Sequence, residues 1–428
     1  MQIQERNGPP FEKRERNLLS NMFKYIFCIQ FLLIVILELY LIVRGVISAS
    51  DSHRFHPKKW YLPLLSSTAC AGIAGFAWQL LTSINPSRAF KAAFVISPLV
   101  TCAYGILLVS IGSKGSAAAA VFALASAVIQ SLYACWVHSR FQHATRILVL
   151  SVASSPPRIR TAAPLLIFIC TFYSAFLLCG IGGATAIGTN KLNVLFIFLT
   201  LLSLTWTLHV ARNMMFITVS HIKFMRFASG TEAELKTVIR DSAMNSIGRV
   251  CFGSILVPVL GVIRGLARAT GLLTGDVDEF MFSCANCCTG VAKRFVVYGN
   301  RWGFVHVAVY NKGIVQASKD TWEIFNRTGI EMLIDTDLTS SFCFLCGIAA
   351  GSLCALVAGT WALFVQKSYA TELSLYAFLT GYLLNRVAMA WIQASVAAYY
   401  VAYAENPQNQ QFDGTIPDYI QALQRLQR

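Results

Sequence analysis

The sequence predicts an all-α integral membrane protein, a multi-pass bundle of about ten transmembrane helices with both termini in the cytoplasm. Of its 428 residues, 56% are hydrophobic and only 13% are charged, whereas soluble globular domains carry about 25% charged residues. Long uncharged runs reach the length of about 20 residues that crosses a bilayer as a helix. These observations exclude an ordinary soluble enzyme, a disordered chain and a collagen-like chain.

Clear apolar runs follow one another along the chain, separated by Gly, Pro, Asn or basic residues that mark turns. They are Phe23–Ile47, Tyr61–Ile84, Phe90–Ile111, Ala117–Val137, Pro164–Ile187, Leu192–Val219, Phe342–Val365 and Leu373–Tyr403. Two weaker stretches, Val250–Ile263 and Trp302–Val315, are short for a straight span and indicate shorter, tilted or re-entrant helices. With them the total is about ten spans, and about eight is the alternative.

The formal charge of +15 is explained by the membrane, because basic residues gather in the connections between apolar runs, as they do on the cytoplasmic side of membrane proteins. We therefore expect membrane lipids, and not nucleic acid, as partners. The loops expected in the cytoplasm carry Arg88 and Lys91, then Arg140, Arg146, Arg158 and Arg160, then Lys223, Arg226, Lys236 and Arg240. The first connection, with Arg54, Lys58 and Lys59, is also basic but falls on the opposite side.

Glu38 is the only acidic residue well inside one of the clear apolar runs. Acidic side chains inside a membrane are expensive and usually functional. Glu38 is therefore a candidate counter-charge for a cationic solute or a proton carrier. The alternative is a protonated or hydrogen-bonded group that fixes the packing of the bundle.

Aromatic residues make up 12% of the chain, and several lie in central or late apolar runs. Their faces can bind a quaternary ammonium ion, so Trp206, Tyr382 and Trp391 are candidate binding residues. The alternative is that they fill the bundle or lie in the aromatic belts at the membrane surfaces. Tyr399, Tyr400 and Tyr403 are expected to form such a belt.

Signals for catalysis, metals and cofactors are weak. The histidines show no zinc-binding helical pair, no phosphate-binding GxxxxGK sequence occurs, and no nucleophile with a base is evident. We therefore expect neither an enzyme nor a bound metal or cofactor. Cys284, Cys287 and Cys288 are candidates for S-acylation beside a membrane, with unmodified thiols as the alternative, and Asn326 begins a glycosylation sequon.

Several motifs occur in order between Leu204 and Phe364. They are WTLHVARN with a later Thr218-Val219 pair, CFGSILVPVLGVIR, NRWGFVHVAVYNKG, SKDTW and IDTDL. In content and order they resemble the choline transporter-like family of eukaryotic multi-pass membrane proteins. The resemblance implies a ten-span bundle with cytoplasmic termini that moves choline or a related amine without ATP. Asn213 and Thr218, polar residues of the first motif, are further candidate binding residues.

The sequence departs from the family pattern in three places. Ser220-His221 follows the Thr-Val pair where the family usually has Ala-Gly, and the first external connection, Ala49–Trp60, is short. The last span carries Gln393 where members often have an acid, which increases the interest of Glu38. The glycine and serine of the FGS segment, Gly253 and Ser254, are interpreted as packing residues.

The predicted organisation is a cytoplasmic tail over residues 1–21, a transmembrane transporter domain over 22–404 and a cytoplasmic tail over 405–428. In the last tail, Ile416, Ile420 and Leu423 share one helical face, which predicts an amphipathic helix.

The predicted function is transport of choline or a related organic cation, facilitative or coupled to an ion gradient, by alternating access. The alternatives are transport of ethanolamine or another headgroup, and a non-transporting trafficking or scaffold protein. The plasma membrane is the expected location, with the trans-Golgi or another endomembrane as the alternative.

Overall fold

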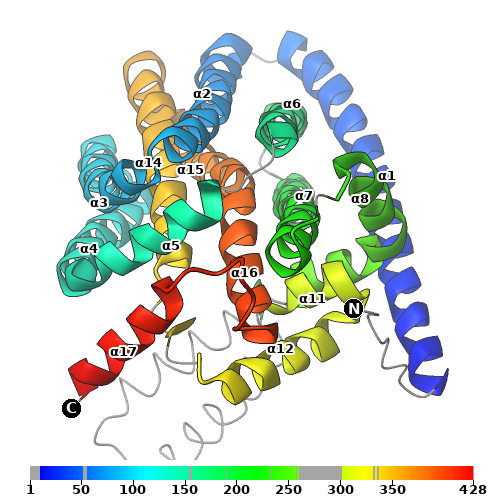
Figure 1. Ribbon diagram of the computed structural model, residues 1–428. Helices are drawn as coiled ribbons and strands as arrows, with labels where there is room; N and C mark the ends of the chain where they lie inside the picture. Colours follow the sequence, from blue (N-terminus) through cyan, green and yellow to red (C-terminus); the bar gives the residue numbers. More distant parts are fainter. Residues whose placement is uncertain are drawn as a thin grey trace, which may run out of the picture. The chain divides into compact units, whose positions relative to one another are not determined.

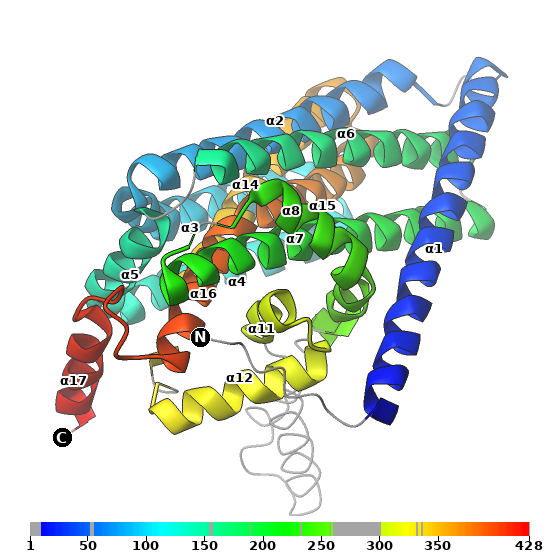
Figure 2. The ribbon, with the colours of Figure 1, turned by 45° about the vertical axis from the view of Figure 1, so that its right-hand side comes forward.

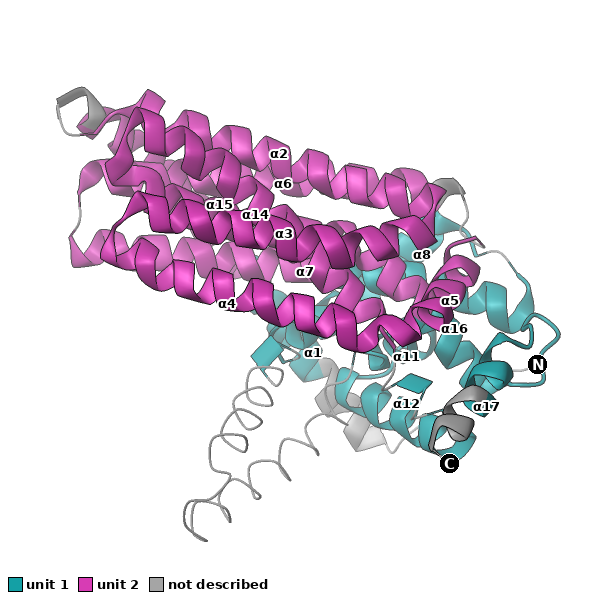
Figure 3. Ribbon diagram, turned by 90° about the vertical axis from the view of Figure 1, so that its left-hand side faces the viewer, with its two compact units in different colours: residues 1–28, 213–335, 397–428 teal, residues 29–212, 336–396 magenta. Residues whose placement is uncertain are grey.

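The computed structural model describes residues 10–427 except 52–54, 154–156, 189, 232, 257, 260–300, 331–332 and 335–336. In these described residues all regular structure is helical, as predicted (Figure 1). The chain forms two compact units. Unit 1 comprises residues 1–28, 213–335 and 397–428, and unit 2 comprises residues 29–212 and 336–396 (Figure 3).

Unit 2 is a bundle of long helices that lie side by side (Figure 3). Its complete helices are α2 (Pro57–Ile84), α3 (Pro86–Ile111), α4 (Lys114–Val137), α5 (Phe141–Ala153), α6 (Pro157–Ile187), α14 (Thr339–Val365) and α15 (Ala370–Ala388). It also takes parts of α1 (Pro10–Asp51), α7 (Lys191–Ser229) and α16 (Ala390–Glu405). Short 3-10 turns, η1 (His138–Arg140) and η3 (Lys367–Tyr369), precede α5 and α15.

The described residues contain 7 helices that are long and apolar enough to cross a membrane, or up to 8 when one bent pair is counted as a single span. They correspond to the clear apolar runs of the sequence. The weak stretch at 302–315 contains α11 (Gly303–Tyr310), whose 8 residues rise only about 12 Å. Much of the other weak stretch, at 250–263, lies outside the described residues. A total of ten spans and the orientation of the termini remain predictions.

The loops expected around Arg140 and Lys223 are helical instead. Arg146 lies on α5, Arg158 lies in the first turn of α6, and Lys223 and Arg226 lie on the last turns of α7. Lys223 is fully buried, with its Nζ 5.8 Å from the centroid of the Phe227 ring. Polar composition indicated a loop at these places, but a helix can continue past an apolar run when its polar residues find partners inside the protein.

The last predicted run is not one straight helix. It is broken at Met389, and the two parts, Lys367–Ala388 and Ala390–Glu405, are bent by 41°. Neither Pro nor Gly lies at the break, so the usual local causes of a kink do not explain it.

The core of unit 2 is built on small residues. α14 packs against α15, α3 and α2, and its Ala350, Cys354, Ala355, Ala358 and Ala362 are each at most 1% exposed. In lipid, where apolar side chains gain little from leaving their surroundings, small residues permit the close backbone approach that holds helices together. The buried cysteines of α14 therefore act as small packing residues.

Unit 1 contains the second half of α7, α8 (Leu235–Asp241), a π turn η2 (Ser242–Ser246), α11, α12 (Ile314–Thr328) and α17 (Thr415–Gln427). α11 ends at Asn311, whose φ of 53° is left-handed, and this turn brings α12 against α11 (Figure 2). Tyr399, Tyr400 and Tyr403, at the end of α16, are buried in this unit. The interpretation of these tyrosines as a membrane-surface belt is therefore wrong.

The contact between α1 and α6 in unit 2 depends on Gly183. A Cβ atom at this position would lie 2.2 Å from the carbonyl oxygen of Leu41, and one at Gly45 would lie 2.3 Å from the Cα of Gly183. The two backbones therefore touch directly, which only glycine allows.

We expect Gly183→Ala to destabilise the protein by about 1–3 kcal/mol, because α1 must move away from α6. Gly115→Ala is the matched control, since the nearest atom to its Cβ would lie 3.9 Å away and alanine favours a helix. Thermal unfolding of the detergent-purified variants measures both. Equal stability of the two variants would contradict the close contact.

Candidate functional site

Glu38 lies in unit 2, where α1 faces α6 and α7. Its side chain is fully buried, and its Oε1 accepts a hydrogen bond of 2.6 Å from Thr200 Oγ1 on α7. Among the described residues, its Oε2 has no hydrogen-bond partner. A Cβ atom at Gly180 of α6 would lie 1.5 Å from Oε2, so glycine at this position makes room for the carboxyl group.

A carboxylate in an apolar interior is costly unless a cation or several donors accompany it. One hydroxyl donor satisfies only part of the hydrogen-bonding capacity of Glu38. The group must therefore carry its own proton or attract a positive charge. A carboxyl group in these surroundings can bind a cation or a proton, and its bond to Thr200 also contributes to packing; the binding role of Glu38 stays a prediction.

Hydroxyl groups of α7 extend this polar region along one face of the helix. Thr200, Ser203 and Thr207 follow at spacings of three and four residues, which places them on the same side. Gln30 Nε2 donates to Ser203 Oγ, and Tyr173 Oη donates to Thr207 Oγ1 over 3.3 Å. Sequence reasoning did not identify this face, although hydroxyl residues at helical spacing in an apolar run were a signal for it.

The other predicted binding residues of unit 2 lie in separate surroundings. Trp206 is half-buried on α7. Tyr382 stacks on Phe378 with ring centroids 6.5 Å apart and meets the ring of Phe344 edge-on at 6.1 Å. Trp391 is 2% exposed, and its indole N–H has no hydrogen-bond partner in the described part of the chain.

Asn213 and Thr218 belong to unit 1. Asn213 Nδ2 donates to Ser254 Oγ over 2.9 Å, and Thr218 is buried. A Cβ atom at Gly253 would lie 2.8 Å from the Phe304 ring. The FGS segment therefore packs against its neighbours, as predicted, and Asn213 has a structural partner there. The six predicted residues are divided between the two units.

A second polar group in unit 2 is rich in positive charge. Arg212 Nη2 on α7 donates to Gln393 Oε1 on α16, and His209 lies within electrostatic range of Arg212 and Arg386. His209 Nδ1 donates to the Thr205 carbonyl oxygen over 2.9 Å. The Gln393 amide is neutral and offers a cation no counter-charge, whereas the Glu38 carboxyl group can provide one.

An apolar groove of about 530 Å³ lies between α2 and α6 of unit 2. Ile73, Phe168 and Phe172 line it and are largely exposed. The hydroxyl groups of Thr68 and Thr171 bond to carbonyl oxygens of their own helices. The groove offers a cation no charged partner, so we do not assign it to the substrate.

The candidate modification sites remain predictions. Cys284, Cys287 and Cys288 lie outside the described residues. Asn326 is exposed in the last turn of α12, where its side chain is accessible.

Long apolar helices with polar groups buried between them define a polytopic helical membrane protein. The sequence matches the protein family described as "Plasma-membrane choline transporter" over residues 120–408. This match covers more than half of the chain, which therefore belongs to that family of membrane transporters. The resemblance seen in the motifs is confirmed.

Individual relatives are fungal proteins. The chain is similar to Protein PNS1 of Mycosarcoma maydis, with 25% identity over 368 residues that cover 79% of this chain and 69% of the relative. It is also similar to Protein PNS1 of Cryptococcus neoformans var. neoformans, with 29% identity over 185 residues covering 41% of this chain and 33% of that protein. For Protein pns1 of Aspergillus fumigatus the identity is 26% over 179 residues, covering 40% and 33% respectively.

We expect Thr200→Val to destabilise the protein by about 2 kcal/mol, because it removes a hydrogen bond to a buried carboxyl group. Thr185→Val is the matched control. The Thr185 hydroxyl bonds to the Ile181 carbonyl oxygen of its own helix, and its loss should cost about 0.5 kcal/mol. Denaturation of both variants in detergent measures their stabilities. An equal loss would show that the bond from Thr200 to Glu38 stabilises the protein no more than the bond of Thr185 to its own helix.

Proposed function

We propose that the chain is a membrane transporter for choline or a related organic cation, facilitative or coupled to an ion gradient. The family description supports transport. The single observation that supports a cation is Glu38, a buried carboxyl group with one oxygen that no described residue binds. The plasma membrane is the proposed location, with the trans-Golgi or another endomembrane as the alternative.

The chemistry of a quaternary ammonium ion suits the surroundings of Glu38. Such an ion has no N–H to donate, so it is recognised by negative charge and by the faces of aromatic rings. Tyr173 lies within electrostatic range of Glu38, and its ring stacks on Phe31 with centroids 5.7 Å apart. We therefore propose Glu38 as the counter-charge and keep Trp206, Tyr382, Trp391, Asn213 and Thr218 as further candidate contacts.

The break at Met389 is consistent with alternating access. Transporters commonly use discontinuous helices around their binding sites, and rearrangement of such helices opens the site to one side at a time. The bent pair α15–α16 is a broken helix of this kind.

Two alternatives remain. The first is transport of ethanolamine or another headgroup. Ethanolamine carries a primary ammonium group, and an aromatic site prefers a quaternary ammonium ion over a primary one. A trafficking or scaffold protein would work through its basic segments and through α17, on which Ile416 and Tyr419 are buried.

The deciding experiment measures uptake of labelled choline by purified protein in liposomes, with imposed pH or voltage gradients. We expect saturable uptake, and its dependence on a gradient identifies the coupling. Competition by ethanolamine weaker than competition by choline supports a quaternary site. If ethanolamine but not choline is taken up, ethanolamine replaces choline as the proposed substrate. If folded protein transports neither, the scaffold function is favoured.

Glu38→Gln tests the counter-charge. The amide keeps the shape of the side chain and an oxygen for Thr200, but it removes the charge, so we expect choline uptake to fall at least about tenfold. Glu372→Gln is the matched control, because Glu372 is an exposed acid on α15 of the same unit. Undiminished uptake by Glu38→Gln would leave the residue a packing role only.

Trp206→Ala tests the aromatic contact. If the indole face binds the ammonium group, the KM for choline should rise about tenfold while the protein still reaches the membrane. Trp136→Ala is the control, since Trp136 is 67% exposed on α4. Uptake by Trp206→Ala that resembles the wild type would remove Trp206 from the site.

A further inference from the structure

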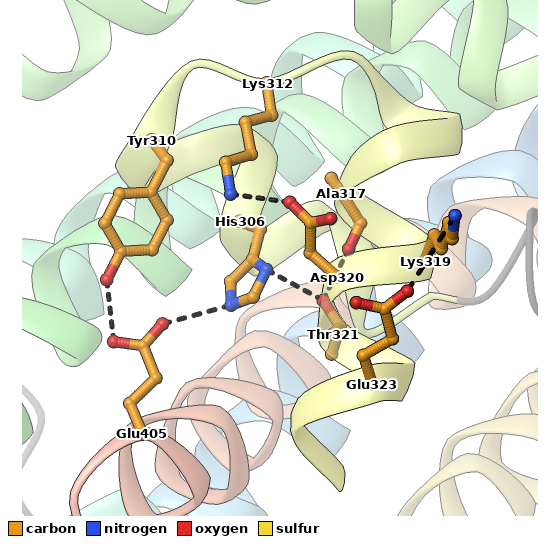
Figure 4. A network of polar contacts seen from close by, with 9 residues as sticks. All are labelled: His306, Tyr310, Lys312, Ala317, Lys319, Asp320, Thr321, Glu323 and Glu405. Carbon is orange, nitrogen blue, oxygen red and sulfur yellow. Dashed lines mark hydrogen bonds and ion pairs between the residues drawn. The ribbon is translucent and has the colours of Figure 1, made fainter. Parts of the chain in front are cut away.

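His306 occupies the centre of a polar network in unit 1 that joins α11, α12 and the end of α16 (Figure 4). The residue is 1% exposed. Its Nδ1 lies 3.1 Å from Thr321 Oγ1, and its Nε2 lies 3.1 Å from Glu405 Oε1. Tyr310 Oη lies 2.6 Å from the other oxygen of the same carboxyl group, Glu405 Oε2.

The hydrogens of this network can be counted. Thr321 has a single hydroxyl hydrogen, and its Oγ1 lies 2.7 Å from the carbonyl oxygen of Ala317, which can only accept. The hydroxyl therefore donates to Ala317 and accepts from His306, so Nδ1 carries a hydrogen. Burial and the Glu405 carboxylate raise the pKa of the Tyr310 phenol, so Tyr310 keeps its hydrogen and donates to Oε2.

One contact then remains, between Nε2 of His306 and Oε1 of Glu405. With Nδ1 protonated, a neutral imidazole presents a lone pair at Nε2, and an ionised carboxylate presents another at Oε1. Two lone pairs at 3.1 Å repel each other, whereas a hydrogen between them makes a charge-assisted bond. We propose that His306 and Glu405 form a proton-binding site that holds one shared proton and fastens the end of α16 to α11 and α12.

The pair is neutral overall with this proton, on whichever atom it resides. The proton is favoured further because Glu405 is the last residue of α16, where the helix dipole opposes a negative charge.

The other charged groups described near this pair contact other residues and do not replace the shared proton. Lys312 Nζ is paired with Asp320 Oδ2 of α12 at 2.6 Å and lies 5.4 Å from the centroid of the Tyr310 ring. From α7, His221 Nδ1 contacts the Ala308 carbonyl oxygen of α11 at 2.9 Å, while Lys223 lies over Phe227.

The site makes the stability of unit 1 depend on pH in a defined direction. In an unfolded chain a histidine loses its proton near pH 6.5, when carboxyl groups are already ionised. With the proposed shared proton, the folded protein holds one more proton than the unfolded chain once the unfolded histidine has lost its own. The stability that this proton provides falls as the pH rises, and the end of α16 should loosen.

Glu405→Gln removes the shared proton but keeps the hydrogen bonds to His306 and Tyr310. The amide N–H can donate to His306 Nε2 and the amide oxygen can accept from Tyr310, so both bonds persist without a titrating proton. We measure thermal midpoints of the purified full chain from about pH 6 to about pH 9. The wild type should lose several degrees over this range, and Glu405→Gln should lose much less. Asp413→Asn is the matched control, because Asp413 is a unit 1 acid that accepts from Thr415; its profile should resemble the wild type.

A second variant and a direct measurement secure the test if Glu405→Gln folds poorly. His306→Gln also supplies an N–H to Glu405 and should flatten the pH profile. Nitrogen NMR of histidine-labelled wild type in bilayers, with the His306 signals assigned by their loss in His306→Gln, should show both ring nitrogens hydrogen-bonded at neutral pH. A pH dependence like that of the wild type in both variants, or an Nε2 of His306 that makes no hydrogen bond, would overturn the proposal.

Discussion

The hydrocarbon of a bilayer offers a polypeptide no hydrogen-bond partner, and most features of this chain follow from that constraint. Every backbone N–H and C=O in such an environment must be satisfied within the protein, so the spanning segments are helices. Because lipid also removes most of the hydrophobic drive for helices to associate, contact must come from close backbone approach and from polar pairs. The small residues of α14 and the direct contact of Gly183 with α1 provide the first kind of contact.

Polar pairs provide the second kind. Ser97 on α3 donates to Gln130 on α4 over 2.6 Å, and Thr101 lies 3.4 Å from Ser352 on α14. In these pairs each neutral group finds a neutral partner, so they hold helices together. Glu38 differs, because its only described donor is a single hydroxyl and its second oxygen has none. Glu38 is thus an acidic group with hydrogen-bonding capacity left over, which is the basis of its proposed role.

Charge further distinguishes the polar regions. Unit 2 holds a carboxyl group in one region and two arginines with a neutral glutamine in another. A carboxyl group can serve as the counter-charge of a cation and a neutral amide cannot, which is why the proposed function depends on Glu38 and not on Gln393. In unit 1, the ionisable groups around His306 have close partners, and the hydrogen between imidazole and carboxylate completes that set of bonds.

The sequence by itself determined the membrane class and the clear spans and singled out Glu38 as a candidate, because apolar length and a lone acid within an apolar run are local properties. It also carried the family motifs. The tertiary structure alone decided which residues meet. Thr200 and Gly180 reach Glu38 from helices far along the chain, and Glu405 reaches His306 across 99 residues. The bend at Met389 and the burial of Lys223 likewise have no local signal in the sequence.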